Sequence, residues 1–300
     1  SHAFAFGVTA YQASWLKYHY PLEFYFGLFN QQPMGFYNLE TLKEDARRHG
    51  IQVLHPDINR SREKCTIDGD AVRLGFLNVA SVGRAAARAA IDARDSDGPF
   101  ASIADFMERT GIPHEGLDNL SDAGAFDSLA VDRRAIRWEI GLRYRPVDSQ
   151  LALALPVSAD MAELNQATAW EQMDGEYRTM GLHPDGHVMA YLREQLGSDV
   201  LTSQDMSGLE DGTEVTVAGL VIRRQRPLGK AVFITLEDEH GHSPLILWPK
   251  VYARYRQVLK EPLVQVKGAI SRRDGTMNIL VAHVKKLAVV MEAPKAKNWG

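Results

Sequence analysis

The sequence predicts an α+β protein of several domains, helical in its N-terminal part and all-β near its C-terminus. Two observations predict this. Short helix-like runs separated by Gly and Pro follow one another from residue 74 to about residue 140, whereas strand-like runs with alternating apolar residues dominate residues 214–287. We expect five segments, at residues 1–73, 74–145, 146–208, 209–290 and 291–300.

The composition is that of a globular protein with sizeable cores. The 300 residues are 45% hydrophobic and 24% charged. No apolar run approaches the ~18 residues of a membrane-spanning helix. The chain starts with Ser-His-Ala rather than Met, and we therefore expect it to be part of a longer protein. Its single cysteine, Cys65, excludes an internal disulfide framework and a cysteine-rich zinc site, and it fits a cytoplasmic protein.

The first 73 residues are expected to hold three helices and a small hairpin. Residues 9–20 and 21–32 space aromatic and aliphatic side chains by three and four, and Pro21 suits the first turn of a helix. The run LETLKEDARRHG ends with basic residues and Gly50, which is typical of a helix end. A short strand and a hairpin that turns at Asp68-Gly69 follow.

The run FLNVASVGRAAARAAIDAR has the pattern of a helix-hairpin-helix. Apolar residues lead to a tight turn at Val82-Gly83, and an Ala-rich helix follows. Such a turn directs backbone N–H groups and the positive end of the next helix at a phosphate. The predicted duplex-binding residues are Ser81, Val82, Gly83, Arg84 and Arg88. A plain helical hairpin without a ligand is the alternative.

A second, weaker copy of this hairpin is expected from Leu117 through the run DAGAFD, with Gly124 at its turn and as a further DNA contact. Many such hairpins have glycine at both ends of the turn, whereas the first hairpin of this chain reads Ser81-Val82-Gly83. The missing first glycine predicts weaker contact between this hairpin and DNA.

Residues 146–160 are rich in Pro, Ser and Ala and are expected to form a linker, after which two helix-like runs lead to the β domain. Between those runs stands HPDGH, in which His183, Asp185 and His187 have ligand-type side chains. The Pro and Gly within this run mark a turn, and no distant third ligand is evident. We therefore expect surface turn residues and no metal.

Residues 209–290 are expected to form an OB-fold, a small Greek-key barrel. Three strand-like runs, a helix-like run and two further strand-like runs occur in the order of this fold. The strands are expected at residues 214–222, 231–237, 244–248, 263–270 and 276–287. The loops that flank its binding face are then residues 225–229 and 271–275.

Cations concentrate in this barrel. Residues 209–290 hold 13 Lys and Arg against 8 Asp and Glu, whereas residues 1–208 hold 19 against 29. On the second strand, Phe233 alternates with core residues and is expected on the outer face. An aromatic ring beside cations suits single-stranded nucleic acid, because bases stack without regard to sequence. The predicted contacts are Arg223, Arg224, Arg226, Lys230, Phe233, Arg272 and Arg273.

Motifs for catalysis are missing from the sequence. It has no GxxxxGK[ST] phosphate loop, no GxSxG elbow, no HExxH zinc motif and no D-x-D pair set in a strand. We expect a chain that binds rather than reacts, with no catalytic residue and no metal or cofactor of its own. Three alternatives stay open: Phe233 is a core residue and the arginines are a solvated rim, the chain is a scaffold whose barrel docks protein partners through its basic loop, or it is a stand-alone DNA-binding protein of DNA repair.

The order of these runs resembles the bacterial C-family DNA polymerases, the family of the α subunit of polymerase III. The likeness extends over essentially the whole chain and is carried by SHAFAFGVTAYQASWLKYHYPLEF, RRHGIQVLHPDIN, RLGFLNVASVGRAAARAAIDAR, GPFASIADFMERT and LSDAGAFDSL. Three further runs look more like the error-prone paralogue that acts in damage tolerance: NQQPMGFYNLETLKEDARRHG, VAGLVIRRQRPLGKAVFITLEDEHG and PKAKNWG.

The resemblance implies a DNA-directed DNA polymerase, a nucleotidyltransferase of translesion synthesis, of which this chain is the DNA-handling part. Residues 1–73 would be the end of the fingers, the hairpin would hold duplex DNA, and the barrel would meet single-stranded template. The palm aspartates and their Mg²⁺ would lie elsewhere in the longer protein. The implied partners are DNA, damage-tolerance accessory proteins and, through them, the sliding clamp, with no membrane.

Overall fold

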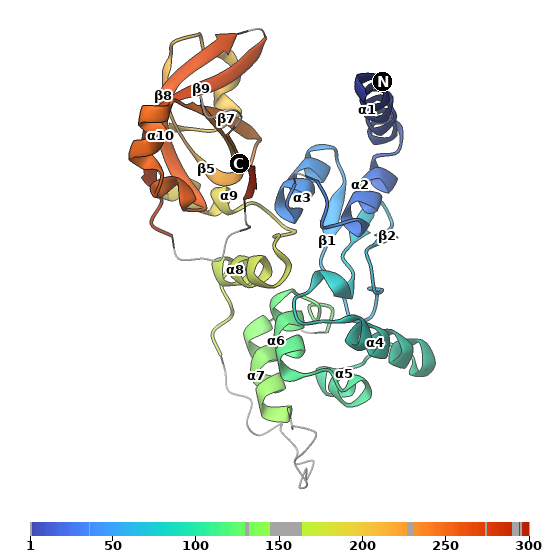
Figure 1. Ribbon diagram of the computed structural model, residues 1–300. Helices are drawn as coiled ribbons and strands as arrows, with labels where there is room; N and C mark the ends of the chain where they lie inside the picture. Colours follow the sequence, from blue (N-terminus) through green and yellow to red (C-terminus); the bar gives the residue numbers. More distant parts are fainter. Residues whose placement is uncertain are drawn as a thin grey trace. The chain divides into compact units, whose positions relative to one another are not determined.

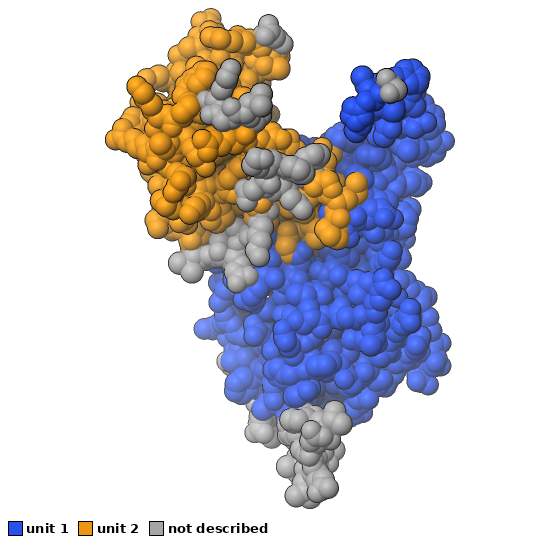
Figure 2. Space-filling view, viewed as in Figure 1, with its two compact units in different colours: residues 1–32, 46–180 blue, residues 33–45, 181–300 orange. Residues whose placement is uncertain are grey.

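The computed structural model describes residues 2–35, 37–129, 132–144, 164–226, 231–273, 275–289, 294 and 296–299. The chain divides into two compact units (Figure 2). Unit 1 is Ser1–Gln32 with Ala46–Met180, and unit 2 is Pro33–Asp45 with Gly181–Gly300. This division differs from the five predicted segments in two places. Residues 33–45, from the first predicted segment, belong to the unit that contains the barrel, and the third predicted segment is divided after Met180.

Unit 1 starts with two helices, α1 (His2–His19) and α2 (Pro21–Asn30). α1 buries none of its side chains, whereas α2 buries Tyr25 and Phe29. A three-stranded sheet follows, with β1 at Gln52–Leu54, β2 at Thr66–Asp68 and β3 at Ala71–Arg73; β1 and β2 are labelled in Figure 1. The spatial order of its strands is β1–β3–β2. β2 and β3 are antiparallel neighbours, which confirms the predicted hairpin.

The rest of unit 1 is helical, as predicted. The α-helices described after the sheet are α4 (Arg84–Asp97), α5 (Ile103–Thr110), α6 (His114–Asp122), α7 (Arg133–Arg143) and α8 (Ala169–Met180). Ser102 caps α5 by accepting a hydrogen bond from the N–H of Asp105. The buried rings of Phe100, Phe106 and Phe126 meet edge to face, with centroid distances of 4.9 and 5.2 Å. They form the centre of the helical core.

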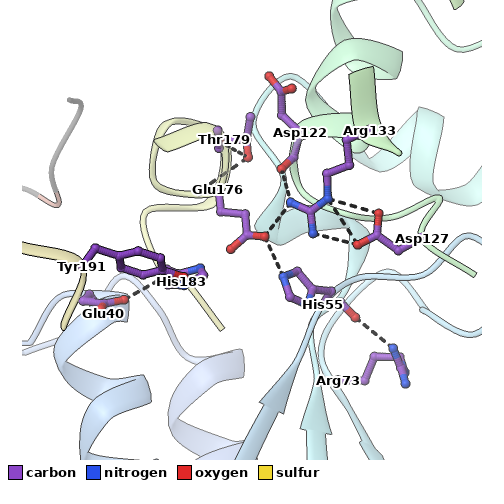
Figure 3. Close-up of polar contacts among 11 residues, drawn as sticks. Glu40, His55, Arg73, Asp122, Asp127, Arg133, Glu176, Thr179, His183 and Tyr191 are labelled. Carbon is purple, nitrogen blue, oxygen red and sulfur yellow. Dashed lines mark hydrogen bonds and ion pairs between the residues drawn. The ribbon is translucent and has the colours of Figure 1, made fainter. Parts of the chain in front are cut away.

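A buried ion network joins the end of α6 to α7 and α8 (Figure 3). The side chain of Arg133 is 7% exposed and donates to Asp127 at 2.7 Å and to Glu176 at 2.5 Å. Nε2 of His55 also lies 2.8 Å from Glu176. Burial acts to lower the pKa of Arg133, but its hydrogen bonds to Asp127 and the charge of Glu176 outweigh burial, so the pKa is raised. Arg133 is therefore a permanent cation that ties the three helices together.

Unit 2 contains a closed five-stranded barrel. Its strands are β5 (Glu214–Gln225), β6 (Val232–Glu237), β7 (His242–Leu247), β8 (Leu263–Arg273) and β9 (Thr276–Lys286). They are neighbours in the order β5–β6–β7–β9–β8, and β8 pairs back onto β5. Helix α10 (Pro249–Tyr255) lies between β7 and β8 in the chain. The predicted order of an OB-fold is confirmed, with a first strand three residues longer than expected.

Alternation of side chains along the strands builds the barrel core. Val232, Ile234 and Leu236 of β6 point inward, and each such buried residue contributes about 1.5–3 kcal/mol. β8 shifts register at Gly268, where an added Cβ would lie 2.3 Å from the carbonyl oxygen of Leu280. Only glycine allows β8 and β9 to approach this closely.

Smaller elements complete unit 2. They are α9 (Val188–Leu192), the 3₁₀ helices η3 (Arg193–Gln195), η4 (Asp205–Gly208) and η6 (Val258–Lys260), and strands β4 (Val200–Leu201) and β10 (Lys297–Trp299). Both short strands pair with β5, and β10 pairs with the last three residues of β5, Arg223–Gln225.

Helix α3 (Leu39–Arg48) brings buried charges into unit 2. Lys43 is 1% exposed, and its ammonium group donates to Glu40 at 3.0 Å and to Glu44 at 2.5 Å. Thr41 donates to the carboxylate of Glu237 at 3.0 Å. The alternation of β6 predicts that Glu237 faces outward, yet it is fully buried, because α3 covers this end of the strand.

The HPDGH run forms the predicted turn at Pro184 and Asp185, and Asp185 is exposed, but the prediction that its histidines lie at the surface is wrong. His183 is 3% exposed and His187 is 1% exposed. The backbone N–H of His183 donates to Glu40 at 3.0 Å, and its Nε2 lies 3.0 Å from the hydroxyl of Tyr191 (Figure 3). The run therefore packs onto α3 inside unit 2. Burial raises the pKa of Glu40 at this contact.

Candidate nucleic-acid interface

The predicted hairpin joins the 3₁₀ helix η1 (Phe76–Asn78) to α4. Val82 is buried, and Gly83 is the N-cap residue of α4, where it offers no side chain to the first-turn N–H groups. The first turn of α4 holds no acidic residue. Uncapped N–H groups at the positive end of a 14-residue helix are the arrangement that binds phosphate oxygens.

The turn forms although serine stands where glycine was expected. Ser81 has φ of 60° and is the one residue other than glycine with positive φ among those described. This left-handed conformation costs a serine roughly 1–2 kcal/mol. The hydroxyl of Ser81 donates to Glu115 at 2.6 Å, and the N–H of Ala80 donates to the carbonyl of Thr179 at 2.8 Å. Contacts on both sides hold the turn in place.

Arg84 and Arg88 lie one helical turn apart on the exposed side of α4. Their side chains are 70% and 68% exposed. The structure therefore brings four of the predicted residues to one end of the helix: Ser81, Gly83, Arg84 and Arg88. Val82 anchors the turn in the core instead of facing solvent.

Gly124 stands at a turn, as predicted, but that turn uses its N–H within the chain. It follows α6 with φ of 80°, its N–H donates to the carbonyl of Ser121, and the N–H of Ala125 donates to that of Leu120. These two bonds form a Schellman motif, which ends the helix. The N–H of Gly124 is used inside the chain, so we leave it out of the interface.

The outer face of the barrel holds two of the other predicted residues, Phe233 and Arg223. Phe233 is 38% exposed and stands opposite Gln225 of β5 and Ile246 of β7. Arg223 shares this face, because it precedes Gln225 by two positions, and its guanidinium lies 5.8 Å from the ring of Tyr37. Phe233 is therefore an exposed ring beside a cation, as expected, and not a core residue.

Two predicted cations serve the fold instead. Arg224 donates through Nε to the carbonyl of Leu259 at 2.8 Å, and burial lowers its pKa. Arg272 donates to three carbonyls of the segment before β5, those of Met206, Ser207 and Leu209. Guanidiniums that satisfy backbone carbonyls hold loops in place and have fewer donors left for phosphates.

The remaining predicted cations are exposed or lie outside the described residues. Arg226 is exposed, with its guanidinium 5.6 Å from the ring of Tyr252 on α10. Arg273 is exposed, and its side chain has no hydrogen bond or ion pair among the described residues. Lys230 lies outside the residues that the structure describes.

Sequence reasoning missed three aromatic residues of unit 2 that are exposed or contact the predicted cations. Trp248 follows β7 and is 55% exposed, Tyr37 is 48% exposed under Arg223, and Tyr252 lies beside Arg226. The alternation of the run LILW after the inward Leu247 could have identified Trp248 as an outward residue. The contact of Tyr37 with Arg223 spans 186 positions, and no local pattern signals it.

Neither a metal group nor a membrane helix is found in the described part of the chain. No set of three or more His, Cys, Asp or Glu side chains there is placed to hold a metal ion. No helix among the described residues is long and apolar enough to cross a membrane.

Two family models match parts of this chain. A helix-hairpin-helix motif model matches residues 50–136, and a model described as an OB-fold nucleic acid binding domain matches residues 215–287. Among solved structures, asparaginyl-tRNA synthetase from Pyrococcus horikoshii is 24% identical over 32% of this chain and 24% of its own, with a TM-score of 0.28.

Curated relatives match nearly the whole chain. The error-prone DNA polymerase of Anaeromyxobacter dehalogenans is 36% identical over 96% of this chain and 27% of its own length. That of Sinorhizobium medicae is 34% identical over 97% and 29%, and error-prone DNA polymerase 3 of Agrobacterium fabrum is 38% identical over 94% and 28%. The chain thus spans little more than a quarter of the length of these relatives. By this similarity and by its two domains, the chain belongs to the error-prone group of the C-family DNA polymerases and corresponds to a segment of them.

Proposed function

We propose that the chain is the DNA-binding segment of an error-prone DNA polymerase that acts in translesion synthesis. The hairpin of unit 1 holds duplex DNA by its backbone, and the barrel of unit 2 holds single-stranded template. Nucleotide transfer, with its Mg²⁺, belongs in this proposal to parts of the longer relatives that this chain does not match. Damage-tolerance accessory proteins and, through them, the sliding clamp are the proposed protein partners, in the cytoplasm.

The observation that carries the proposal is the outer face of the barrel. Phe233 exposes its ring there on the same face as Arg223, Trp248 exposes its ring just after β7, and Arg226 lies at the end of β5 beside Tyr252 of α10. Rings that stack on bases and cations that neutralise phosphates together bind single strands without reading their sequence. Arg223 lies over the ring of Tyr37 and Arg226 over the ring of Tyr252. These contacts hold each guanidinium at the surface of the protein.

Binding of a labelled oligothymidine to the full chain tests the barrel. Phe233→Ala should weaken binding by about ten-fold, because one stacked base contributes roughly 1–3 kcal/mol. The matched control is Ile67→Ala in the sheet of unit 1, which also removes an exposed apolar side chain, one that is 43% exposed, and should leave binding unchanged. Equal affinities of the Phe233→Ala variant and the unaltered chain would remove the barrel face from the proposal.

The salt dependence of the same binding tests the cations. Removal of Arg223 and Arg226 should reduce the slope of log affinity against log salt by about 1.4, since each single-strand phosphate contact contributes about 0.7. Lys286→Ala, which removes an exposed cation at the end of β9, is the control and should leave the slope unchanged. A slope that is the same in all three proteins would contradict an electrostatic role for these arginines.

A further inference from the structure

Two carboxylates stand at the phosphate-binding end of the hairpin, although neither belongs to its helix. Glu63 comes from the segment before β2, and Glu115 comes from the first turn of α6. α4 itself has no acid in its first turn, as expected for a helix end that binds an anion. The acids therefore reach this end by tertiary packing.

Glu63 pairs with both exposed arginines of α4. Its Oε1 lies 3.4 Å from Nε of Arg84, and its Oε2 lies 3.6 Å from Nε of Arg88. One carboxylate thus bridges the two cations that the sequence assigns to duplex binding. Glu63 is also better anchored than they are, because its side chain is 27% exposed against 70% and 68%.

Glu115 is held beside the turn itself. Ser81 donates its hydroxyl to Oε1 of Glu115 at 2.6 Å. The next residue, Gly116, lies beside the turn, since an added Cβ there would be in ordinary contact with the carbonyl oxygen of Ser81, at 3.5 Å. The start of α6 therefore lies against the turn, and it brings the carboxylate of Glu115 there.

These acids oppose the ligand that the hairpin is built to take. A DNA phosphate that approaches the first turn of α4 meets Glu115 at the turn and competes with Glu63 for both arginines. At contact distances of about 4 Å in a water-like medium, one such like-charge pair weakens binding about five-fold.

We propose that Glu63 and Glu115 act as electrostatic brakes that hold the duplex affinity of the hairpin below the level its cations and N–H groups would otherwise give. This inference rests on the proposed function, since it concerns the same duplex-binding hairpin. Because the affinity is lowered, the duplex dissociates readily from the hairpin. The brake is permanent, because it is made of fixed side chains and requires no ligand.

The test measures binding of the full chain to a labelled DNA duplex by fluorescence anisotropy. Glu63→Gln and Glu115→Gln should each tighten binding about five-fold, and the double variant should tighten it by on the order of twenty-fold. The isosteric change keeps the hydrogen-bonding shape of each side chain. The control is Glu108→Gln on α5, an exposed acid without an ion pair among the described residues, which changes the net charge equally and should leave affinity within two-fold.

A second variant separates failure of this inference from failure of the proposed function. Loss of Arg84 and Arg88 together, both changed to Ala, should weaken duplex binding if the hairpin is the duplex site. If that variant binds as the unaltered chain does, the hairpin is not the site and the proposed function fails there. If it binds more weakly while the Glu63→Gln and Glu115→Gln variants bind no more tightly than Glu108→Gln, the hairpin binds duplex and the brake is overturned.

Discussion

The stability of a Gly124→Ala variant tests how rigidly the buried ion network of unit 1 holds the guanidinium of Arg133. Gly124 has φ of 80°, and an added Cβ would lie 2.4 Å from Nη2 of Arg133 and 2.8 Å from Oδ2 of Asp127. The methyl group fits only if the guanidinium moves. Arg133 is held by Asp127, by Glu176 and by the carbonyl of Asp122, so a movement breaks at least one of these contacts.

Two costs set the expected loss of stability. A left-handed alanine costs roughly 1 kcal/mol relative to glycine. Removal of one partner from a buried ion pair costs on the order of 3 kcal/mol. We expect Gly124→Ala to lower the free energy of unfolding by about 4 kcal/mol, if neither cost relaxes.

Gly111→Ala is the matched control. Gly111 also ends a helix of unit 1, α5, with φ of 59°, but nothing lies within 4 Å of an added Cβ there. Its substitution should therefore cost only the backbone term of about 1 kcal/mol. Urea denaturation followed by far-ultraviolet circular dichroism gives both values. Equal losses for the two variants would show that the network yields to a methyl group, and the reasoning would be refuted.

Two further predictions concern the barrel and the cysteine. Arg272→Ala should lower the free energy of unfolding of unit 2 by about 1 kcal/mol, because the guanidinium of Arg272 donates to backbone carbonyls. The affinity of this variant for oligothymidine should equal that of the Lys286→Ala control. A loss of affinity as large as that of Arg226→Ala would show that Arg272 belongs to the interface. Burial raises the pKa of the Cys65 thiol, so less thiolate is present near neutral pH than in a free cysteine. Iodoacetamide should therefore label Cys65 far more slowly in the native protein than in urea, and equal rates would contradict its burial.

The sequence was sufficient for the barrel because every strand carries its own signal. Val232, Ile234 and Leu236 alternate with outward residues, and the same period fixes the side on which Phe233 is exposed. The helix-hairpin-helix was likewise predictable, since the turn at Val82-Gly83 and the Ala-rich helix are local features. Ser81 shows that the backbone of this turn forms without the expected glycine.

What the sequence could not provide are contacts between distant segments. Glu237 follows the alternation of β6 and was expected outside, but Thr41, 196 positions earlier, buries it. Arg224 and Arg272 look like loop cations until the carbonyls that they satisfy are known. For the same reason Glu63 was not recognised as a neighbour of Arg84, because a single sequence carries no signal for a tertiary ion pair.

The place of α3 has a consequence for the order in which the chain folds during synthesis. Lys43 and Glu40 find their partners, the carbonyl of Gly186 and the N–H of His183, 143 positions later. At about 5–20 residues per second a ribosome needs on the order of ten seconds to make the intervening chain. Through that interval Lys43 and Glu40, which are both buried in the folded protein, lack these two partners. Unit 1, which ends at Met180, is therefore able to fold while unit 2 has only its early stretch, residues 33–45, so unit 2 is completed later in translation.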